Sequence, residues 1–435
     1  MKNPLWVLLR EENGSICSVC SANETVLRAA LRQGKRLNRP VLIEATANQV
    51  NQFGGYTGML PKDFVAYVHK LADEEHFDLH NLILGGDHLG PLTWTAEPEE
   101  EAMRKAEELV SLFVEAGFLK IHIDTSMRLG DDDPNEPLPV EKVARRSARL
   151  AAAAEKAYAC RVQTVPDAAH PVYVIGSEVP IPGGAQEDGE TVIVTSPKDF
   201  VDMMDTFRRV YLENGLENAF SRIVAAVVQP GVEFSDDTVT EYCPQKATDL
   251  VASLKAYDGL AFEGHSTDYQ TRECLRDMVR DGIRILKVGP ALTFAAREGL
   301  YALENIEKEV CEGELSHFRA TLEETMCADS RYWKKYYHGS EHEVAMKRAF
   351  SYSDRSRYYM GEKAVQESMS RLFANLDAAR IPLSVLSQYM PNQYARVRAG
   401  SLRVNARDLC ADRVRDYLDD YSFACGELDE TEHKG

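Results

Sequence analysis

The chain has 435 residues, of which 44% are hydrophobic and 27% are charged, the composition of an ordinary globular protein. Its 69 acidic residues outnumber its 50 basic residues, and the formal net charge of −19 repels nucleic acid and acidic membrane surfaces. No apolar run reaches the roughly 18 residues of a transmembrane helix. Nine scattered cysteines favour a reduced protein over a disulfide scaffold. We therefore expect a cytoplasmic protein with no membrane or nucleic-acid partner.

Short apolar runs alternate with helix-like segments from about residue 16 to residue 311. The runs are mostly continuous, as expected of parallel strands buried on both faces. The predicted strands are 16–22, 41–46, 82–87, 120–126, 172–179, 222–229, 260–266 and 285–290. The predicted helices are 24–36, 61–76, 98–117, 140–158, 197–213, 245–256, 270–281 and 291–311.

Eight strand–helix units predict an α/β fold of the (β/α)8 TIM-barrel type, with a doubly wound open sheet as the alternative. The alternation stops after residue 312. The rest of the chain is rich in charged residues and tyrosine, and its pattern is helical. We expect a barrel over residues 1–312 and a helical C-terminal extension over residues 313–435 that packs on the barrel.

Polar residues collect at the C-terminal ends of the predicted strands, where barrel enzymes keep their active sites. One polar residue at a strand end is usually a turn or cap residue, but a closed barrel brings all of these ends together. The polar residues are Glu44, Asp87, His88, His122, Asp124, Glu178, Gln229, Glu263, His265 and Lys287.

A divalent metal site is the first interpretation of this pattern. The imidazoles of His88 and His265 and the carboxylate of Glu178 suit zinc, manganese or cobalt, and Gln229 or a water would complete the shell. Each residue also has an ordinary structural explanation. A lone histidine at a strand end is more often a satisfied polar residue, and Glu178 can cap the turn that follows it. Their joint occurrence favours the metal site.

Asp87 directly precedes His88, and successive residues on a strand point to opposite faces. A bend at the two glycines before them would let both side chains face the mouth of the barrel, one as a ligand and the other as a proton-transfer group. His122 and Asp124 share one face of their strand. His122 lies deeper, so we expect it to have a core or supporting role.

Lys287 on the last strand has two alternative roles. It can be a Schiff-base amine, or a cation that binds phosphate or substrate oxygens. A neighbouring metal site favours the second role. The turns at Gly183-Gly184, Gly264 and Gly289 can offer backbone N–H groups to a phosphate, although glycine is the default residue of a turn.

Several long motifs resemble the GatZ/KbaZ family, the Z-type subunits of tagatose-1,6-bisphosphate aldolase. They are ICSVCSAN, VLIEATANQVNQFGGYTGM, LILGGDHLGP, KIHIDTSM, YVIGSEVPIPGG, EGHSTDYQ, LKVGPALTFAARE and SYSDRSRYY. The resemblance extends over nearly the whole chain and implies a barrel related to class II, metal-dependent aldolases. Family members are described variously as a tagatose-6-phosphate kinase, as a non-catalytic subunit and as ketose 4-epimerases. The sequence contains no phosphate-binding loop or kinase motif.

The aldolase pattern implies that Asp87 is the acid/base at the C4 oxygen and that His88 and His265 are metal ligands. Gln229 stands where the aldolases have a further histidine, which argues against ordinary bisphosphate aldolase activity. Asp124 and Glu178 complete the implied catalytic residues. The implied substrate contacts are Glu44, Asn48, Gln52, Ser266, Lys287 and Gly289.

The preferred function is a metal-dependent 4-epimerase of a ketohexose or ketohexose 6-phosphate, of the tagatose/fructose type, by a retro-aldol route. Zinc is the expected ion, with manganese, cobalt and nickel as alternatives. The alternative function is a non-catalytic accessory subunit of class II tagatose-1,6-bisphosphate aldolase in galactitol, tagatose or N-acetylgalactosamine catabolism. A class II aldolase that acts alone is a third interpretation, and a homo-oligomer is compatible with the helical extension.

Overall fold

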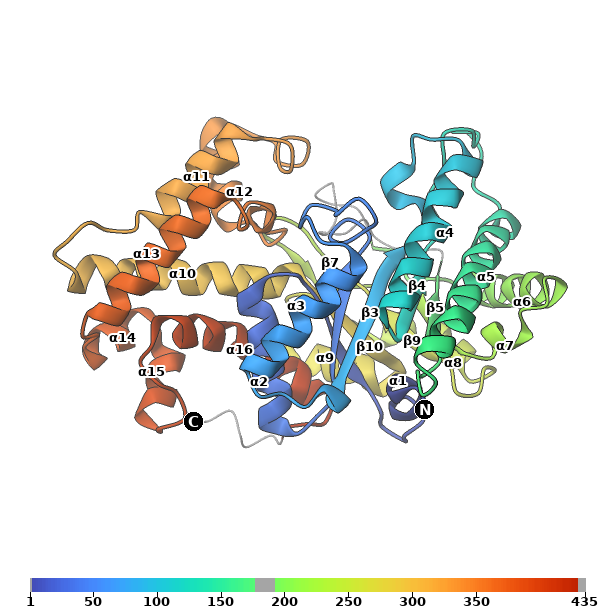
Figure 1. The fold of residues 1–435 in the computed structure, drawn as a ribbon, viewed down its shortest axis with the longest axis horizontal. Helices are drawn as coiled ribbons and strands as arrows, with labels where there is room; N and C mark the ends of the chain where they lie inside the picture. The colour runs from blue at the N-terminus through green and yellow to red at the C-terminus, as the bar shows by residue number, and fades with distance from the viewer. Residues whose placement is uncertain (1, 177–191, 429–435) are drawn as a thin grey trace.

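The computed structural model describes residues 2–176 and 192–428. Eight parallel strands close into a barrel in the order β1-β10-β9-β6-β5-β4-β3-β2, which confirms the TIM barrel over the open sheet (Figure 1). The barrel strands are β1 (Ile16–Cys20), β2 (Val41–Thr46), β3 (Leu82–Leu89), β4 (Lys120–Ile123), β5 (Val172–Ile175), β6 (Ile223–Val228), β9 (Ala261–Gly264) and β10 (Ile283–Val288).

The predicted connecting helices cover the outside of the barrel. One differs clearly from its predicted length, since α5 continues to Thr164 instead of ending at residue 158. The connections also contain a short antiparallel pair, β7 (Glu233–Phe234) and β8 (Val239–Thr240). The connecting helices are α2 (Glu24–Leu37), α3 (Pro61–Glu74), α4 (Glu99–Ala116), α5 (Val140–Thr164), α6 (Pro197–Glu213), α7 (Glu217–Phe220), α8 (Pro244–Leu254), α9 (Arg272–Arg280) and α10 (Pro290–Val310). Within the described residues, no helix combines the length and apolarity needed to cross a membrane.

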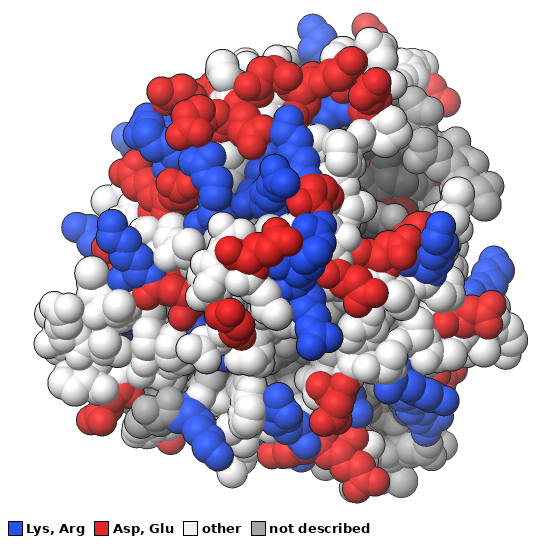
Figure 2. Space-filling model, turned by 90° about the vertical axis from the view of Figure 1, so that its right-hand side faces the viewer, with Lys and Arg blue, Asp and Glu red and all other residues white. Residues whose placement is uncertain are grey.

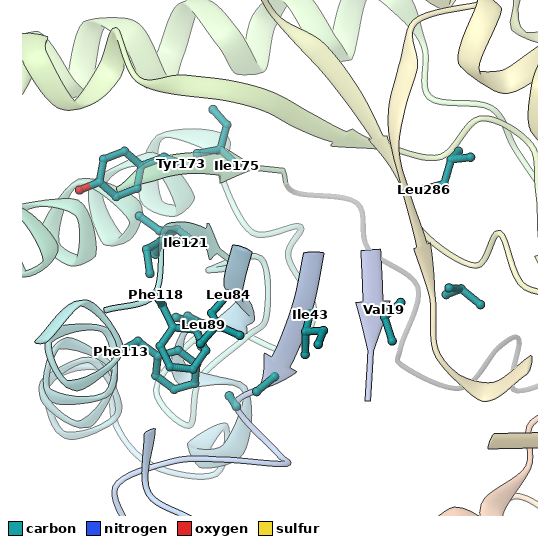
Figure 3. Packing of buried hydrophobic residues seen from close by; sticks show 14 of the residues in the cluster. Val19, Ile43, Leu84, Leu89, Phe113, Phe118, Ile121, Tyr173, Ile175 and Leu286 are labelled. Carbon is teal, nitrogen blue, oxygen red and sulfur yellow. The ribbon is translucent and has the colours of Figure 1, made fainter. Parts of the chain in front are cut away.

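Alternate residues of each strand point outward and form the core between strands and helices. Leu84 and Leu89 of β3 lie beside Phe113 of α4 and Phe118, as Figure 3 shows. The two phenylalanine ring centroids are 4.4 Å apart. Burial of each such side chain stabilises the fold by about 2–3 kcal/mol. This outer core fixes which strand residues are left to face the barrel interior.

The N-terminal end of the barrel is closed by apolar side chains. The short helix α1 (Pro4–Leu8), which the sequence pattern did not predict, places Leu5 in an inner core with Leu42 and Ile83. Asn3 anchors this helix, since its side-chain amide donates to the carbonyl oxygens of Leu119 and His170 at 2.8 Å. With this end filled, the polar interior residues are confined to the C-terminal half of the barrel.

The described chain after α10 adds six α-helices and the short 3-10 helix η3 (Arg355–Tyr358). Leu300, Leu303 and Ile306 of α10 belong to a second hydrophobic core that most of these helices share, so α10 contributes to two cores. The last helix, α16, returns to pack against α2, α9 and α10 (Figure 1). The helices are α11 (Phe318–Ala328), α12 (Glu341–Phe350), α13 (Lys363–Ala378), α14 (Leu383–Tyr389), α15 (Pro391–Arg398) and α16 (Ala406–Ala424).

Basic and acidic side chains interleave on the face that carries α4, α5 and α6 (Figure 2). Arg149 of α5 pairs with Glu100 of α4 at 3.1 Å and with Glu107 of α4 at 2.7 Å. Arg209 of α6 pairs with Glu141 of α5. The described part of this face therefore presents no continuous basic surface of the kind that nucleic-acid binding requires.

Candidate active site

The strand β3 contains two glycines at its middle, where neighbouring side chains leave no room for a Cβ atom. A Cβ at Gly85, on the inner face, would lie 2.8 Å from Cγ of Glu44. A Cβ at Gly86, on the outer face, would lie 2.7 Å from Cδ1 of Phe113. Both distances are far shorter than a carbon–carbon contact of about 3.5–4.0 Å. The glycines allow β3 to pass close to both neighbours.

The same strand then changes its direction. The register of β3 against β4 shifts between Gly86 and Leu89, and His88 has a φ of 48° in the left-handed region. A shift of this kind redirects side chains and is common beside active sites. As a result, Asp87 and His88 both line the cavity at the mouth of the barrel, although they are adjacent in the chain.

Four buried side chains from β3, β4 and the end of β9 meet at this mouth. One ligand atom from each of Asp87, His88, His122 and His265 lies within 4.8 Å of the others. The three imidazole ring centroids are 5.0–5.3 Å apart. Imidazole nitrogens together with a carboxylate are the ligands that zinc and similar ions prefer. The arrangement therefore fits a divalent transition-metal ion.

Carboxylates from outside this group of four orient two of the three imidazoles. Oδ2 of Asp124 lies 2.9 Å from Nδ1 of His88, and Oε1 of Glu263 lies 2.9 Å from Nε2 of His265. Such a contact sets which ring nitrogen carries the proton and leaves the other as a lone-pair donor. Burial, together with the charge of Lys287, lowers the pKa of His265 to about 3, so this ring is neutral and able to bind a metal.

His122 belongs to the group itself and not only to its support. Its Nδ1 lies 2.9 Å from Oδ1 of Asp87, and its Nε2 is buried with no hydrogen-bond partner among the described residues. Burial lowers the pKa of His122, which keeps the ring neutral. A buried polar atom without a partner is costly, and a metal ion would satisfy it. The shared face of His122 and Asp124 along the strand was the sequence signal for this inward position.

Below the histidines lies a buried layer of alternating charges. Nζ of Lys120 is 2.6 Å from Oε1 of Glu44 and 2.7 Å from Oε2 of Glu263. Nζ of Lys287 contacts Asp87 and lies 3.5 Å from Oε2 of Glu44. Each of these side chains is at most 6% exposed. The sequence interpretation gave Lys120 and Glu263 no role, although both occupy inward positions.

These contacts determine the charge states of Lys287 and Asp87. Burial opposes the charge on Lys287, but the carboxylates of Asp87 and Glu44 hold its pKa well above the ordinary value. Because a Schiff base requires the neutral amine, the raised pKa favours the role of a cation over that of a nucleophile. Burial likewise opposes ionisation of Asp87, but His88, Lys287 and the hydrogen bond with His122 hold its pKa well below the usual range.

A cavity of about 520 Å³ opens above this group, within the size range of small-molecule sites. Asp87, His88, His265 and Lys287 form part of its lining. The loops after β1 and β2 and residues 357–366 of the C-terminal extension supply other parts of the wall. The predicted substrate contacts that line the cavity are Asn48, Ser266, Lys287 and Gly289.

Other predicted site residues lie elsewhere. Glu44 is fully buried in the charged layer. Gln52 uses its amide to donate to the carbonyl oxygen of Lys105 at 2.9 Å and does not line the cavity. The amide oxygen of Gln229 accepts from the backbone N–H groups of residues 231 and 232 at 2.8 and 2.9 Å. Because this oxygen holds the turn after β6, we remove Gln229 from the expected metal ligands. Glu178 lies outside the described residues.

The expected phosphate donor at Gly289 is already engaged. Oδ1 of Asp268 accepts from the N–H of Gly289 at 3.1 Å and from the N–H of Ala291 at 2.8 Å, at the start of α10. Asp268 is 3% exposed, and burial raises its pKa to about 6. The N–H of Gly289 is therefore already bonded within the protein, and Gly289 as a substrate contact stays a prediction.

The closed parallel barrel and the buried titratable groups at its C-terminal mouth define a TIM-barrel protein with an enzyme-like site. The chain belongs to the family described as D-tagatose-1,6-bisphosphate aldolase subunit GatZ/KbaZ-like, whose model matches residues 8–426. Family membership places the protein in a sugar-metabolism role related to tagatose-bisphosphate aldolase.

One solved structure is similar to this chain over nearly its whole length. The chain is 42% identical to a probable tagatose 6 phosphate kinase from Sinorhizobium meliloti 1021, with 94% of this chain and 100% of that chain covered and a TM-score of 0.85. It is 11% identical to the YdjI aldolase from Escherichia coli K12, with 86% of this chain and 98% of that chain covered and a TM-score of 0.40. It is 14% identical to a fructose-bisphosphate aldolase from Campylobacter jejuni, with 87% of this chain and 95% of that chain covered and a TM-score of 0.40. The last two are too distant to carry a conclusion.

Proposed function

We propose that this protein is a metal-dependent 4-epimerase of a ketohexose or a ketohexose 6-phosphate of the tagatose/fructose type. The convergence of Asp87, His88, His122 and His265 in one buried group, with Nε2 of His122 lacking a partner, is the main support. A protein with only a scaffolding role has no physical need for such a group below a cavity.

The proposed ligands are the imidazoles of His88, His122 and His265, with Asp87 left for proton transfer. His122 thereby supplies the ligand that was expected from Gln229, and Glu178 stays a prediction. Three nitrogen ligands with an open position are typical of catalytic zinc, and manganese, cobalt and nickel accept them too. A divalent ion at this place supplies Lewis-acid polarisation of the substrate carbonyl and of the enediolate that forms from it.

The chemistry must invert C4, which carries no acidic proton because it is not adjacent to the C2 carbonyl. Asp87 would accept the proton of the C4 hydroxyl. The C3–C4 bond then breaks, its electron pair forms the enediolate over C2 and C3, and C4 becomes an aldehyde. After the aldehyde turns, C3 attacks its other face, and Asp87 returns the proton to the C4 oxygen. No atom or electron is gained or lost.

Neighbouring residues prepare Asp87 for this role. The contact with Lys287 keeps the Asp87 carboxylate ionised, which is the form that accepts a proton. Asp124 holds the His88 ring and is a positioning residue. The cavity, at about 520 Å³, has room for both fragments of the cleaved sugar.

The alternative function is an accessory subunit that supports a tagatose-bisphosphate aldolase catalytic chain. The family description, which names an aldolase subunit, favours this candidate. The cavity would then hold a regulatory ligand, and the C-terminal extension would offer a partner surface.

The test uses the purified chain alone. Its metal content is measured first, and the protein is then incubated with fructose 6-phosphate, fructose or tagatose and with added zinc, manganese, cobalt or nickel. NMR follows inversion at C4, and we expect inversion that a chelator abolishes. A chain without bound metal or turnover, which only enhances a separate aldolase, would refute the epimerase and support the accessory subunit.

A further inference from the structure

The C-terminal extension contributes a basic residue to the cavity wall. Arg357 lines the cavity, and the other Lys or Arg in the described lining is Lys287, which contacts Asp87. The guanidinium of Arg357 donates to the carbonyl oxygens of Ser353 and Asp354 and to the hydroxyl of Tyr358. These acceptors are neutral. Within the described part of the chain, Arg357 has no carboxylate at ion-pair distance.

A second arginine strengthens the positive charge near this wall. Arg355 is 5% exposed, its guanidinium lies 3.1 Å from the centroid of the Tyr336 ring, and it donates to the carbonyl oxygen of Tyr332. It too lacks a carboxylate partner among the described residues. Burial and the neighbouring charge of Arg357 lower the pKa of Arg355, so the two cations repel each other. In a chain of net charge −19, two neighbouring arginines with no described carboxylate at ion-pair distance favour an anion beside them.

The start of α10 cannot take this anion. Its N–H groups at Gly289 and Ala291 are bound by the Asp268 carboxylate, which would repel a second negative group. Glu24 and Glu362 also line the cavity and add to the repulsion along their parts of the wall. Arg357 is therefore the position in the described lining where a negative group gains a charge-assisted hydrogen bond without displacing a carboxylate.

We propose that Arg357 binds the phosphate of a ketohexose 6-phosphate and so makes the phosphorylated sugar the preferred ligand. This inference rests on the proposed function, because it assigns a binding residue to the 6-phosphate of the substrate proposed for the same cavity. The guanidinium fork matches phosphate geometry, and its hydrogen bonds to backbone carbonyls hold it in place before the ligand arrives.

The test compares Arg357→Gln and Arg357→Lys with the wild type, and Arg104→Gln on the exposed surface of α4 serves as the matched control. Calorimetry measures binding of glucitol 6-phosphate and of glucitol, which lack the ketone and cannot be cleaved. We expect the wild type to bind the phosphorylated probe at least tenfold more tightly. In Arg357→Gln, the ratio of the affinity for glucitol 6-phosphate to the affinity for glucitol should fall roughly ten- to a hundredfold. The ratio for Arg357→Lys should lie between those of Arg357→Gln and the wild type. The ratio for the control should equal that of the wild type.

Equal binding of both probes by the wild type, or equal losses for both probes in Arg357→Gln, would overturn the assignment. Tighter binding of gluconate, which carries a carboxylate and no phosphate, would also overturn it. Circular dichroism checks the fold, and Arg357→Lys keeps the test valid if the glutamine variant does not fold. Because these probes do not react, the outcome is independent of epimerase activity. Preferential binding without any C4 inversion would refute the proposed function alone, and inversion without a phosphate preference would refute this inference alone.

Discussion

Glu263 and His265 lie two residues apart in the chain, and Oε1 of the first is 2.9 Å from Nε2 of the second at the end of β9. The other oxygen of Glu263 lies 2.7 Å from Nζ of Lys120. One carboxylate thus orients a proposed ligand and neutralises a buried cation. The His265 ring is held in one position before a metal arrives.

Replacement of this carboxylate should weaken the metal site. We expect Glu263→Gln to lower zinc affinity by roughly 10–100-fold, since partners that orient a ligand have effects of this size. Competition titration with a chromophoric chelator measures the affinity. The exposed Glu341→Gln on α12 is the matched control. Unchanged zinc affinity in Glu263→Gln would show that His265 does not bind the ion.

His122 provides the sharpest test of the proposed ligand set, because sequence interpretation placed it in a supporting role. His122→Gln should reduce bound zinc and abolish the rise in Tm that zinc gives the wild type, since a ligand stabilises only the state that binds it. His342→Gln, on the exposed face of α12, should retain both properties. Full metal content in His122→Gln would remove His122 from the ligands.

Asp87→Asn separates proton transfer from metal binding. The amide keeps the size of the side chain but cannot accept the proton of the C4 hydroxyl. We expect turnover to fall roughly 10²–10⁴-fold, with the metal content retained. Elemental analysis and NMR of C4 inversion measure the two properties on one sample. Turnover close to that of the wild type would exclude Asp87 as the base.

Asp268 should make stability depend on pH. Burial raises its folded-state pKa to about 6, above the ordinary aspartate pKa of about 3.9. Between these two values the folded state binds more protons than the unfolded state, so the stability falls as the pH rises from about 4 to about 6. The full difference is roughly 3 kcal/mol.

Asp268→Asn should remove this part of the pH dependence, because an amide oxygen still accepts from the N–H groups of Gly289 and Ala291 without titrating. Urea unfolding at several pH values measures the effect. The exposed Asp202→Asn on α6 should keep the wild-type profile. Identical profiles for Asp268→Asn and the wild type would contradict the raised pKa.

Most of the fold could be predicted from the sequence because barrel strands and helices have strong local patterns. The eight apolar runs and their helices all appear, with differences mainly at their ends. The helix α1 was not predicted because its five residues are too few to show a period. Its position depends on long-range contacts, such as those that Asn3 makes to residues 119 and 170.

The candidate site was only partly predictable. The two glycines before Asp87 indicated the bend that turns Asp87 and His88 to the mouth. The contact of His122 with Asp87 depends on the register shift between β3 and β4, which local sequence does not encode. The role of Gln229 depends on the turn that follows it, because its amide oxygen accepts hydrogen bonds from two backbone N–H groups of that turn. The partners of Lys120 lie on β2 and β9, so their contact follows from closure of the barrel.

The order in which the chain is synthesised separates two stages of this site. The barrel closes when β10 pairs with β1, so the group formed by Asp87, His88, His122 and His265 can assemble once residue 288 has been made. Arg357, the first residue of the C-terminal extension that lines the cavity, is synthesised 69 residues after residue 288 (357 − 288). If the barrel closes before residues 357–366 are made, the histidines come together while this part of the mouth is still open. In that state an ion has a wider route to the histidines than the finished fold allows.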